Sequence, residues 1–256
     1  MKTLFVAWRA GDEGPGAWGP VGRLEHEGSL FRFCYTKGAR MIPGFRPFAQ
    51  MADLEQVYES EELFPLFANR LLSRSRPEYE MFLRWGGFNV DDPPDPIAVL
   101  SVTEGIRQTD AIEVFPCPQP DSEGCYINKF FLHGVRWAPD GALAIIASLQ
   151  AEAQLVMEPE SSNPVDPNAV AVFQAGSRAR IGFVPRYLAK DVARLLTACG
   201  GGYTHLFVER LNSDAPLQQR VLCRMHACWP VDFEPCSGEQ FQPIPAGVAA
   251  RCDAHR

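Results

Sequence analysis

The stretches Asn163–Val172 (NPVDPNAVAV) and Arg180–Leu188 (RIGFVPRYL) decide the fold of the second half of this chain. The first begins as a turn, because proline fixes φ and Asn or Asp side chains bond their own backbone. An apolar run then stands on each side of a hairpin connection at residues 174–177. Pro185 suits the opening of a helix. The sequence therefore predicts a turn, two strands joined by a hairpin, and a helix.

This order of motifs resembles the HIRAN domain, and the resemblance extends over roughly Tyr126 to Cys228. It implies a small β-barrel of six or seven strands with one short helix after Pro185. The residues around the motif agree, because apolar runs long enough for strands recur through this part of the chain. We expect these further strands at 126–133 (continuing through Gly134–Trp137), 153–158, 203–211 and 219–228, and a short helix at 142–149.

The first half of the chain reads as a separate, β-rich α+β module. Period-2 alternation at 29–35 is typical of a half-buried strand, and a second strand at 19–24 precedes it across a turn. The polar, proline-containing stretch at 118–125 reads as a linker. We therefore predict an α+β fold class overall, organised as a 1–117 module, a 118–125 linker, a 126–228 barrel and a 229–256 proline-rich tail.

Short pieces of the first module resemble the N-terminal subdomain of HipA-type kinases. They are Val21–Leu24 (VGRL), Phe67–Leu71 (FANRL) and Asp110–Pro116 (DAIEVFP), the last departing from the family pattern by carrying Asp110 in place of glycine. In that family the subdomain contacts partner proteins and is not catalytic. The resemblance implies a protein-contact surface. No glycine-rich phosphate loop or catalytic Asp with its metal-binding partners follows it in this sequence.

Charge is distributed unevenly along the chain. The net charge is −7, yet residues 125–227 carry 10 basic and 8 acidic side chains, against 12 and 19 through residue 124. Residues 178–194 carry five basic and one acidic side chain, which is a modest patch beside that of a strong duplex binder. No apolar run reaches the ~20 residues that span a bilayer, and the N-terminus lacks a signal peptide's apolar core. We expect a cytoplasmic protein without membrane contact.

Eight cysteines stand in the chain, and in a cytosolic protein of this length they indicate free thiols. The one cluster, Cys223-x-x-His226-x-Cys228, lacks the paired knuckles of a zinc site, and the odd separation of its cysteines puts them on opposite faces of a strand. We therefore expect structural thiols, no metal and no cofactor. Hydrolase, phosphate-loop and metalloprotease motifs are absent from the sequence, so we expect no enzymatic activity.

The HIRAN resemblance also implies where a ligand would bind. Members that grip a single-stranded DNA end use a basic–aromatic pair, an aromatic–acid pair in the NP motif, and a basic residue after the Gly-containing strand. The corresponding positions here are Arg136, Trp137, Asp166 and Arg186. Aromatic rings stack on bases, arginines pair with phosphates, and a carboxylate accepts from a terminal hydroxyl. The function predicted is non-enzymatic binding of a single-stranded DNA 3′ end.

Each of these residues also has a purely structural interpretation. Asp166 suits an Asx turn, Trp137 suits a barrel core, and both arginines suit a solvated surface. Val165 occupies a position where DNA-binding members carry a ring, and no aromatic stands near Arg210-Leu211. A protein-interaction or adaptor role through the first module is therefore the alternative function.

Overall fold

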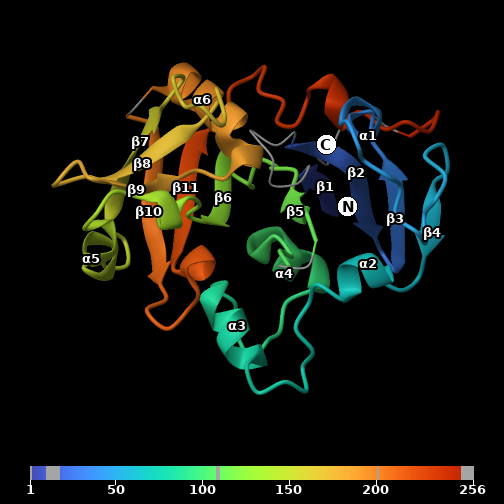
Figure 1. Cartoon of the computed structure of the whole chain (residues 1–256), viewed down its shortest axis with the longest axis horizontal. Coiled ribbons are helices and arrows are strands. Elements are labelled where there is room, and N and C mark those ends of the chain that lie inside the picture. The colour runs from blue at the N-terminus through green and yellow to red at the C-terminus, as the bar shows by residue number, and fades with distance from the viewer. Residues whose placement is uncertain (1, 10–17, 108–109, 201, 249–256) are drawn as a thin grey trace. The chain divides into compact units, whose positions relative to one another are not determined.

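The structure is a computed structural model that describes residues 2–9, 18–107, 110–200 and 202–248. By its internal contacts the chain divides into two compact units, each built around its own sheet (Figure 1). The first unit comprises Met1–Arg76, Pro94–Cys117 and Glu234–Arg256, and the second comprises Pro77–Pro93 and Pro118–Phe233. Both units are therefore discontinuous in sequence.

Two segments group differently from the division predicted from sequence. Helix α3 (Tyr79–Trp85) belongs with the second unit, because the Trp85 indole donates to Asp214 at 3.2 Å and the Trp85 carbonyl accepts from Asn212 at 3.0 Å. The segment that begins at Glu234 belongs with the first unit. Its Phe241 ring lies edge-on to Phe5, with ring centroids 4.9 Å apart.

The first unit contains a five-stranded antiparallel sheet in the order β4-β3-β2-β1-β5. Its strands are β1 (Lys2–Arg9), β2 (Trp18–Glu27), β3 (Leu30–Tyr35), β4 (Tyr58–Ser60) and β5 (Ile112–Pro116). Its helices are α1 (Gly38–Met41), α2 (Pro65–Ala68), α4 (Pro96–Thr103) and the 3₁₀ turn η3 (Glu239–Phe241). Helix α1 is only one turn long.

One face of this sheet buries the apolar core that holds the unit together. Phe33 is fully buried on β3, while its neighbour Arg32 on the opposite face is half-exposed, as period-2 alternation predicts. Helix α4 begins where Asp95 Oδ1 accepts from the Ile97 amide at 2.7 Å, and it packs Ile97 and Leu100 into the same core.

The second unit contains a six-stranded antiparallel sheet in the order β6-β11-β10-β7-β8-β9. Its strands are β6 (Cys125–Phe131), β7 (Gln154–Pro159), β8 (Val170–Gln174), β9 (Arg180–Phe183), β10 (Thr204–Leu211) and β11 (Val221–Cys228). Besides α3, its helices are η1 (Val135–Trp137), α5 (Ala142–Ala147), α6 (Arg186–Cys199) and η2 (Leu217–Gln219). These elements follow the order predicted from the motif.

The two edge strands of this sheet meet at one point. His133, just beyond β6, donates its amide to the Phe183 carbonyl at 3.0 Å, and the Phe183 amide donates back to His133 at 2.9 Å. A Cβ on Gly182 would lie 2.6 Å from the His133 carbonyl oxygen, so only glycine permits this approach. Gly182 thus makes the partial barrel closure possible.

Helix α6 is longer than the short helix expected after Pro185. It is amphipathic over fourteen residues, with Leu188, Val192 and Leu195 buried, and it contacts β8, β10 and β11. Gly200, at φ 70°, follows its last residue, a backbone conformation that favours glycine. The prediction of free thiols is wrong at this end of the unit. Cys199 is joined to Cys228 by a disulfide, because the last residue of α6 reaches the last residue of β11.

Candidate nucleic-acid interface

Asp166 lies in a turn held by side chains of the NP motif. Asn163 Oδ1 accepts from the amides of Val165 and Asp166, at 3.0 and 3.2 Å. Asp166 Oδ1 then accepts from the Asn168 amide at 2.9 Å, which is the Asx-turn geometry that the sequence suggests. This carboxylate therefore has a structural role, and that role occupies one of its two oxygens.

The second oxygen of Asp166 faces Arg186 at the start of α6. Asp166 Oδ2 lies 3.7 Å from Arg186 Nε, and the two side chains are 13% and 31% exposed. No acidic residue stands in the first turn of α6, so the positive end of the helix dipole adds to the Arg186 charge. The structure thus brings two of the four predicted residues together at a surface-accessible helix start.

Arg136 and Trp137 form the other pair, and they lie in a 3₁₀ turn instead of the strand expected there. Gly134, at φ 67°, ends the extended chain and starts η1. Trp137 is 76% exposed, so it is not a core residue. The Arg136 guanidinium carbon lies 5.5 Å from the centroid of the Trp137 ring, a cation–π distance. An aromatic surface with an attached positive charge is therefore open to solvent.

His133 connects the two pairs. Its backbone pairs with Phe183 at the end of β9, and its ring lies edge-on to Tyr187, the second residue of α6, with centroids 6.3 Å apart. Arg136 and Trp137 follow His133 in sequence, and Arg186 precedes Tyr187. The turn that carries Arg136 and Trp137 and the helix that carries Arg186 are thus both anchored at the end of β9.

Phe183 is an aromatic residue at this position that the sequence analysis missed. The Arg180 guanidinium carbon lies 5.1 Å from its ring centroid, and Arg180 also pairs with Glu160 at 3.2 Å. Its location directly after Gly182 in the second motif is the sequence signal for it. Phe183 adds a half-exposed ring beside η1, because a Cβ on Gly134 would lie 2.7 Å from that ring.

Val165 and the Arg210-Leu211 region stand where DNA-binding HIRAN domains carry aromatic rings, and both places are at least partly accessible to solvent. Val165 is 59% exposed, so a ring there would face solvent. Arg210 is exposed and Leu211 is half-buried at the end of β10. The surface therefore offers fewer stacking rings than the DNA-binding pattern implies.

A separate ion-pair network crosses the second sheet over β6, β11 and β10. Glu209 accepts from Lys129 and from Arg224 Nε, the latter at 2.9 Å, and Arg224 also bonds Glu152. Burial acts to raise the pKa of Glu209, but the hydrogen bonds from Lys129 and Arg224 outweigh it and hold that pKa below its usual range. These charges are mutually satisfied, which makes this region a poor phosphate site.

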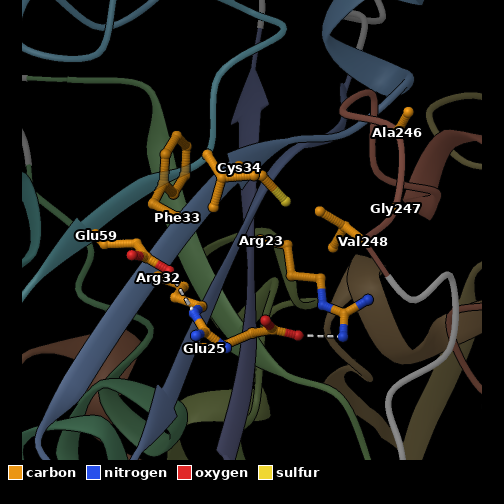
Figure 2. A pocket seen from close by; sticks show the side chains of 10 residues that line it. Arg23, Glu25, Arg32, Phe33, Cys34, Glu59, Ala246, Gly247 and Val248 are labelled. Atoms are coloured by element: carbon orange, nitrogen blue, oxygen red, sulfur yellow. Dashed lines mark hydrogen bonds and ion pairs between the residues drawn. The ribbon is translucent and has the colours of Figure 1, made fainter.

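The first unit contains a cavity of about 490 Å³ on the face of its sheet opposite the main core. Figure 2 shows the Arg23–Glu25 pair and the Arg32–Glu59 pair along it, with Cys34 also among the lining residues. Burial raises the pKa of Cys34 to about 12, against the opposing effect of Arg23. The thiol is therefore protonated at neutral pH, and a protonated thiol is a poor nucleophile.

Two findings apply to residues 2–9, 18–107, 110–200 and 202–248, the part of the chain that the structure describes. No group of three or more His, Cys, Asp or Glu side chains within it is arranged to hold a metal ion. None of its helices combines the length and the apolar character needed to cross a bilayer.

Comparisons with known proteins support the assignment of the second unit. Residues 128–226 match the family model of the HIRAN domain, so this chain contains a HIRAN domain. A search of curated proteins finds no match. The solved structure of the HIRAN domain of human HLTF matches at 14% identity and a TM-score of 0.31, over 41% of this chain and 80% of that one. The solved structure of a protein from Lactobacillus plantarum matches at 21% identity and a TM-score of 0.33, over 41% of this chain and 97% of that one.

The two structural likenesses have TM-scores below 0.5 and add nothing to the argument. The HIRAN match to residues 128–226 does not extend to the first unit, whose resemblance to HipA-type kinases stays a prediction.

Proposed function

We propose that the HIRAN domain of this protein binds the 3′ end of single-stranded DNA, and that the chain acts by binding and not by catalysis. The observation that carries the proposal is the Asp166–Arg186 pair, 3.7 Å apart at the start of α6, in a domain that also exposes Trp137. The HIRAN match to residues 128–226 supports it, because members of that family grip DNA ends.

The chemistry of the four residues fits the parts of a DNA end. Trp137 offers a solvent-exposed ring for base stacking, worth about 1–3 kcal/mol per base. Arg136 and Arg186 pair with phosphates, and the helix start strengthens the field at Arg186. The Asp166 oxygen that is not engaged in the Asx turn accepts a hydrogen bond from a 3′-hydroxyl.

Fluorescence anisotropy with short 5′-labelled oligonucleotides at low salt tests the proposal. We expect Trp137→Ala to weaken binding by about 5- to 150-fold, the equivalent of about 1–3 kcal/mol. Arg186→Ala should reduce the slope of log K against log salt by about 1. An oligonucleotide ending in a 3′-phosphate should bind less tightly than one ending in a 3′-hydroxyl.

Matched controls exist elsewhere in the same unit. Tyr203 is 71% exposed, so Tyr203→Ala removes a similarly exposed ring and should leave binding unchanged. Arg178 lies in the β8–β9 hairpin and pairs with Glu158 of β7, so Arg178→Ala controls for loss of one arginine. The proposal fails if no binding appears below high micromolar concentration, or if the 3′-phosphate makes no difference.

The adaptor role predicted for the first module gains no support from the comparisons. The cavity of the first unit, which the Arg23–Glu25 and Arg32–Glu59 pairs line, does not by itself identify a partner. This alternative therefore stays a prediction from the sequence.

A further inference from the structure

Three cysteines meet at one end of the second sheet. Cys199, the last residue of α6, is bonded to Cys228, the last residue of β11, with their Cα atoms 6.1 Å apart. Cys125, the first residue of β6, pairs directly opposite Cys228 in the β6–β11 ladder and carries a free thiol. All three residues are partly accessible to solvent. The disulfide therefore has a thiol as its cross-strand neighbour.

The ladder places Cys125 and Cys228 at a non-hydrogen-bonded position. The Leu132 amide donates to the Val221 carbonyl at 2.9 Å, which makes those two residues a hydrogen-bonded pair. The two kinds of pair alternate along antiparallel strands, and Cys125 lies seven residues before Leu132 in the same register. Consistently, the amide and the carbonyl of Cys125 both bond to Asp121, at 2.8 and 2.9 Å.

This position allows a disulfide between the two strands. Residues in non-hydrogen-bonded pairs have Cα atoms about 4.5 Å apart and side chains on the same face. That separation falls within the roughly 4.4–6.8 Å that disulfides span. Cys228 is therefore within bonding reach of two different partners, Cys199 and Cys125.

We infer that Cys125, Cys199 and Cys228 form a thiol–disulfide exchange site in which the bond to Cys228 moves between Cys199 and Cys125. The Cys125 thiolate attacks Cys228 Sγ, and a bond between these sulfurs forms as the Cys199–Cys228 bond breaks. The electron pair of the broken bond leaves on Cys199 Sγ, which takes up the proton that Cys125 released. The exchange needs no external oxidant or reductant.

Exchange changes what holds the end of α6. The buried residues of α6 end at Leu195, so its last turn contributes little apolar contact. With the Cys199–Cys228 bond that turn is tied to β11, whereas with the Cys125–Cys228 bond it is not. Amides of the last turn should therefore exchange hydrogen faster in the second state.

Peptide mapping of the intact protein tests this inference. The oxidised chain is incubated at mildly alkaline pH without added thiol, alkylated at intervals and digested with trypsin and a Glu-specific protease. Cleavage after Glu123 separates Cys125 from Cys117, and cleavage after Glu234 separates Cys228 from Cys236. We expect a Cys125–Cys228 linked peptide to appear while alkylation of Cys199 rises and that of Cys125 falls.

A variant isolates the new bond. Cys199→Ser treated with oxidised glutathione should form the Cys125–Cys228 bond with the loss of two hydrogens, and Cys117→Ser, as control, should behave as the wild type. The inference is overturned if a Cys199→Ser protein with native circular dichroism keeps Cys125 and Cys228 fully alkylatable. It is equally overturned if wild-type Cys125 is never recovered in a link to Cys228.

Discussion

Replacing Gly182 with alanine tests the strand closure on which the candidate interface depends. The added Cβ would lie 2.6 Å from the His133 carbonyl oxygen and 2.7 Å from Leu132 Cγ, closer than Cβ atoms normally approach other atoms. His133 cannot retreat without giving up its two backbone bonds to Phe183. Overpacking of this kind costs about 1–3 kcal/mol. We therefore expect the free energy of unfolding to fall by about that amount.

Gly202 provides the matched control. Among the described residues, apart from Gly202 and its chain neighbours, no atom lies within 4 Å of a Cβ built on Gly202, and its φ is outside the left-handed region. Gly202→Ala should therefore be neutral, or stabilising by up to about 1 kcal/mol through the unfolded state. Urea unfolding followed by circular dichroism compares the two variants, and hydrogen exchange reports the His133 and Phe183 amides. Equal urea midpoints for both variants, with unchanged exchange at those amides, would refute the closure argument.

Two further predictions concern buried and paired charges. Arg70→Ala should destabilise the first unit by about 1–3 kcal/mol in urea unfolding, because it leaves the buried Gly105 carbonyl without its donor and the 31% exposed Asp110 without its ion-pair partner at 2.6 Å; an unchanged urea midpoint would contradict this expectation. Glu209, whose pKa is lowered by Lys129 and Arg224, contributes stability above its unfolded pKa of about 4.3 and loses it as pH falls through the folded value. The urea midpoint should therefore drop less below that pH in Glu209→Gln than in wild type; an identical drop would contradict the assignment.

The order of elements in the second unit could be predicted because local chemistry and tertiary structure agree there. Asn163 caps the turn through its own side chain, and Gly182 allows the closest strand approach in the closure. Pro185 stands at the N-cap of α6. Each of these residues acts on its sequence neighbours or on one strand, so its effect can be recognised without knowing the rest of the fold.

The disulfide and the position of Trp137 could not be predicted in the same way. Cys199 and Cys228 are 29 residues apart, and their meeting depends on the length of α6, whose end the sequence marks only by Gly200. Trp137 lies in a 3₁₀ turn because Gly134 adopts a positive φ against the Phe183 ring. That contact joins segments far apart in sequence, and the apolar pattern before it reads as a continuing strand.

Apart from Asp166, which belongs to both sets, the motif residues and the predicted binding residues have different roles in this domain. Asn163, Gly182 and Pro185 shape the turn, the closure and the helix start, so a sequence that keeps them keeps the fold. Trp137 lies outside the motif on an exposed turn, and Val165 can change within it without loss of the turn, because Asn163 bonds its amide and not its side chain. A match to the motif is therefore stronger evidence for the barrel than for its ligand. Whether this domain holds DNA depends on Trp137 and Arg186, which the binding measurements test directly.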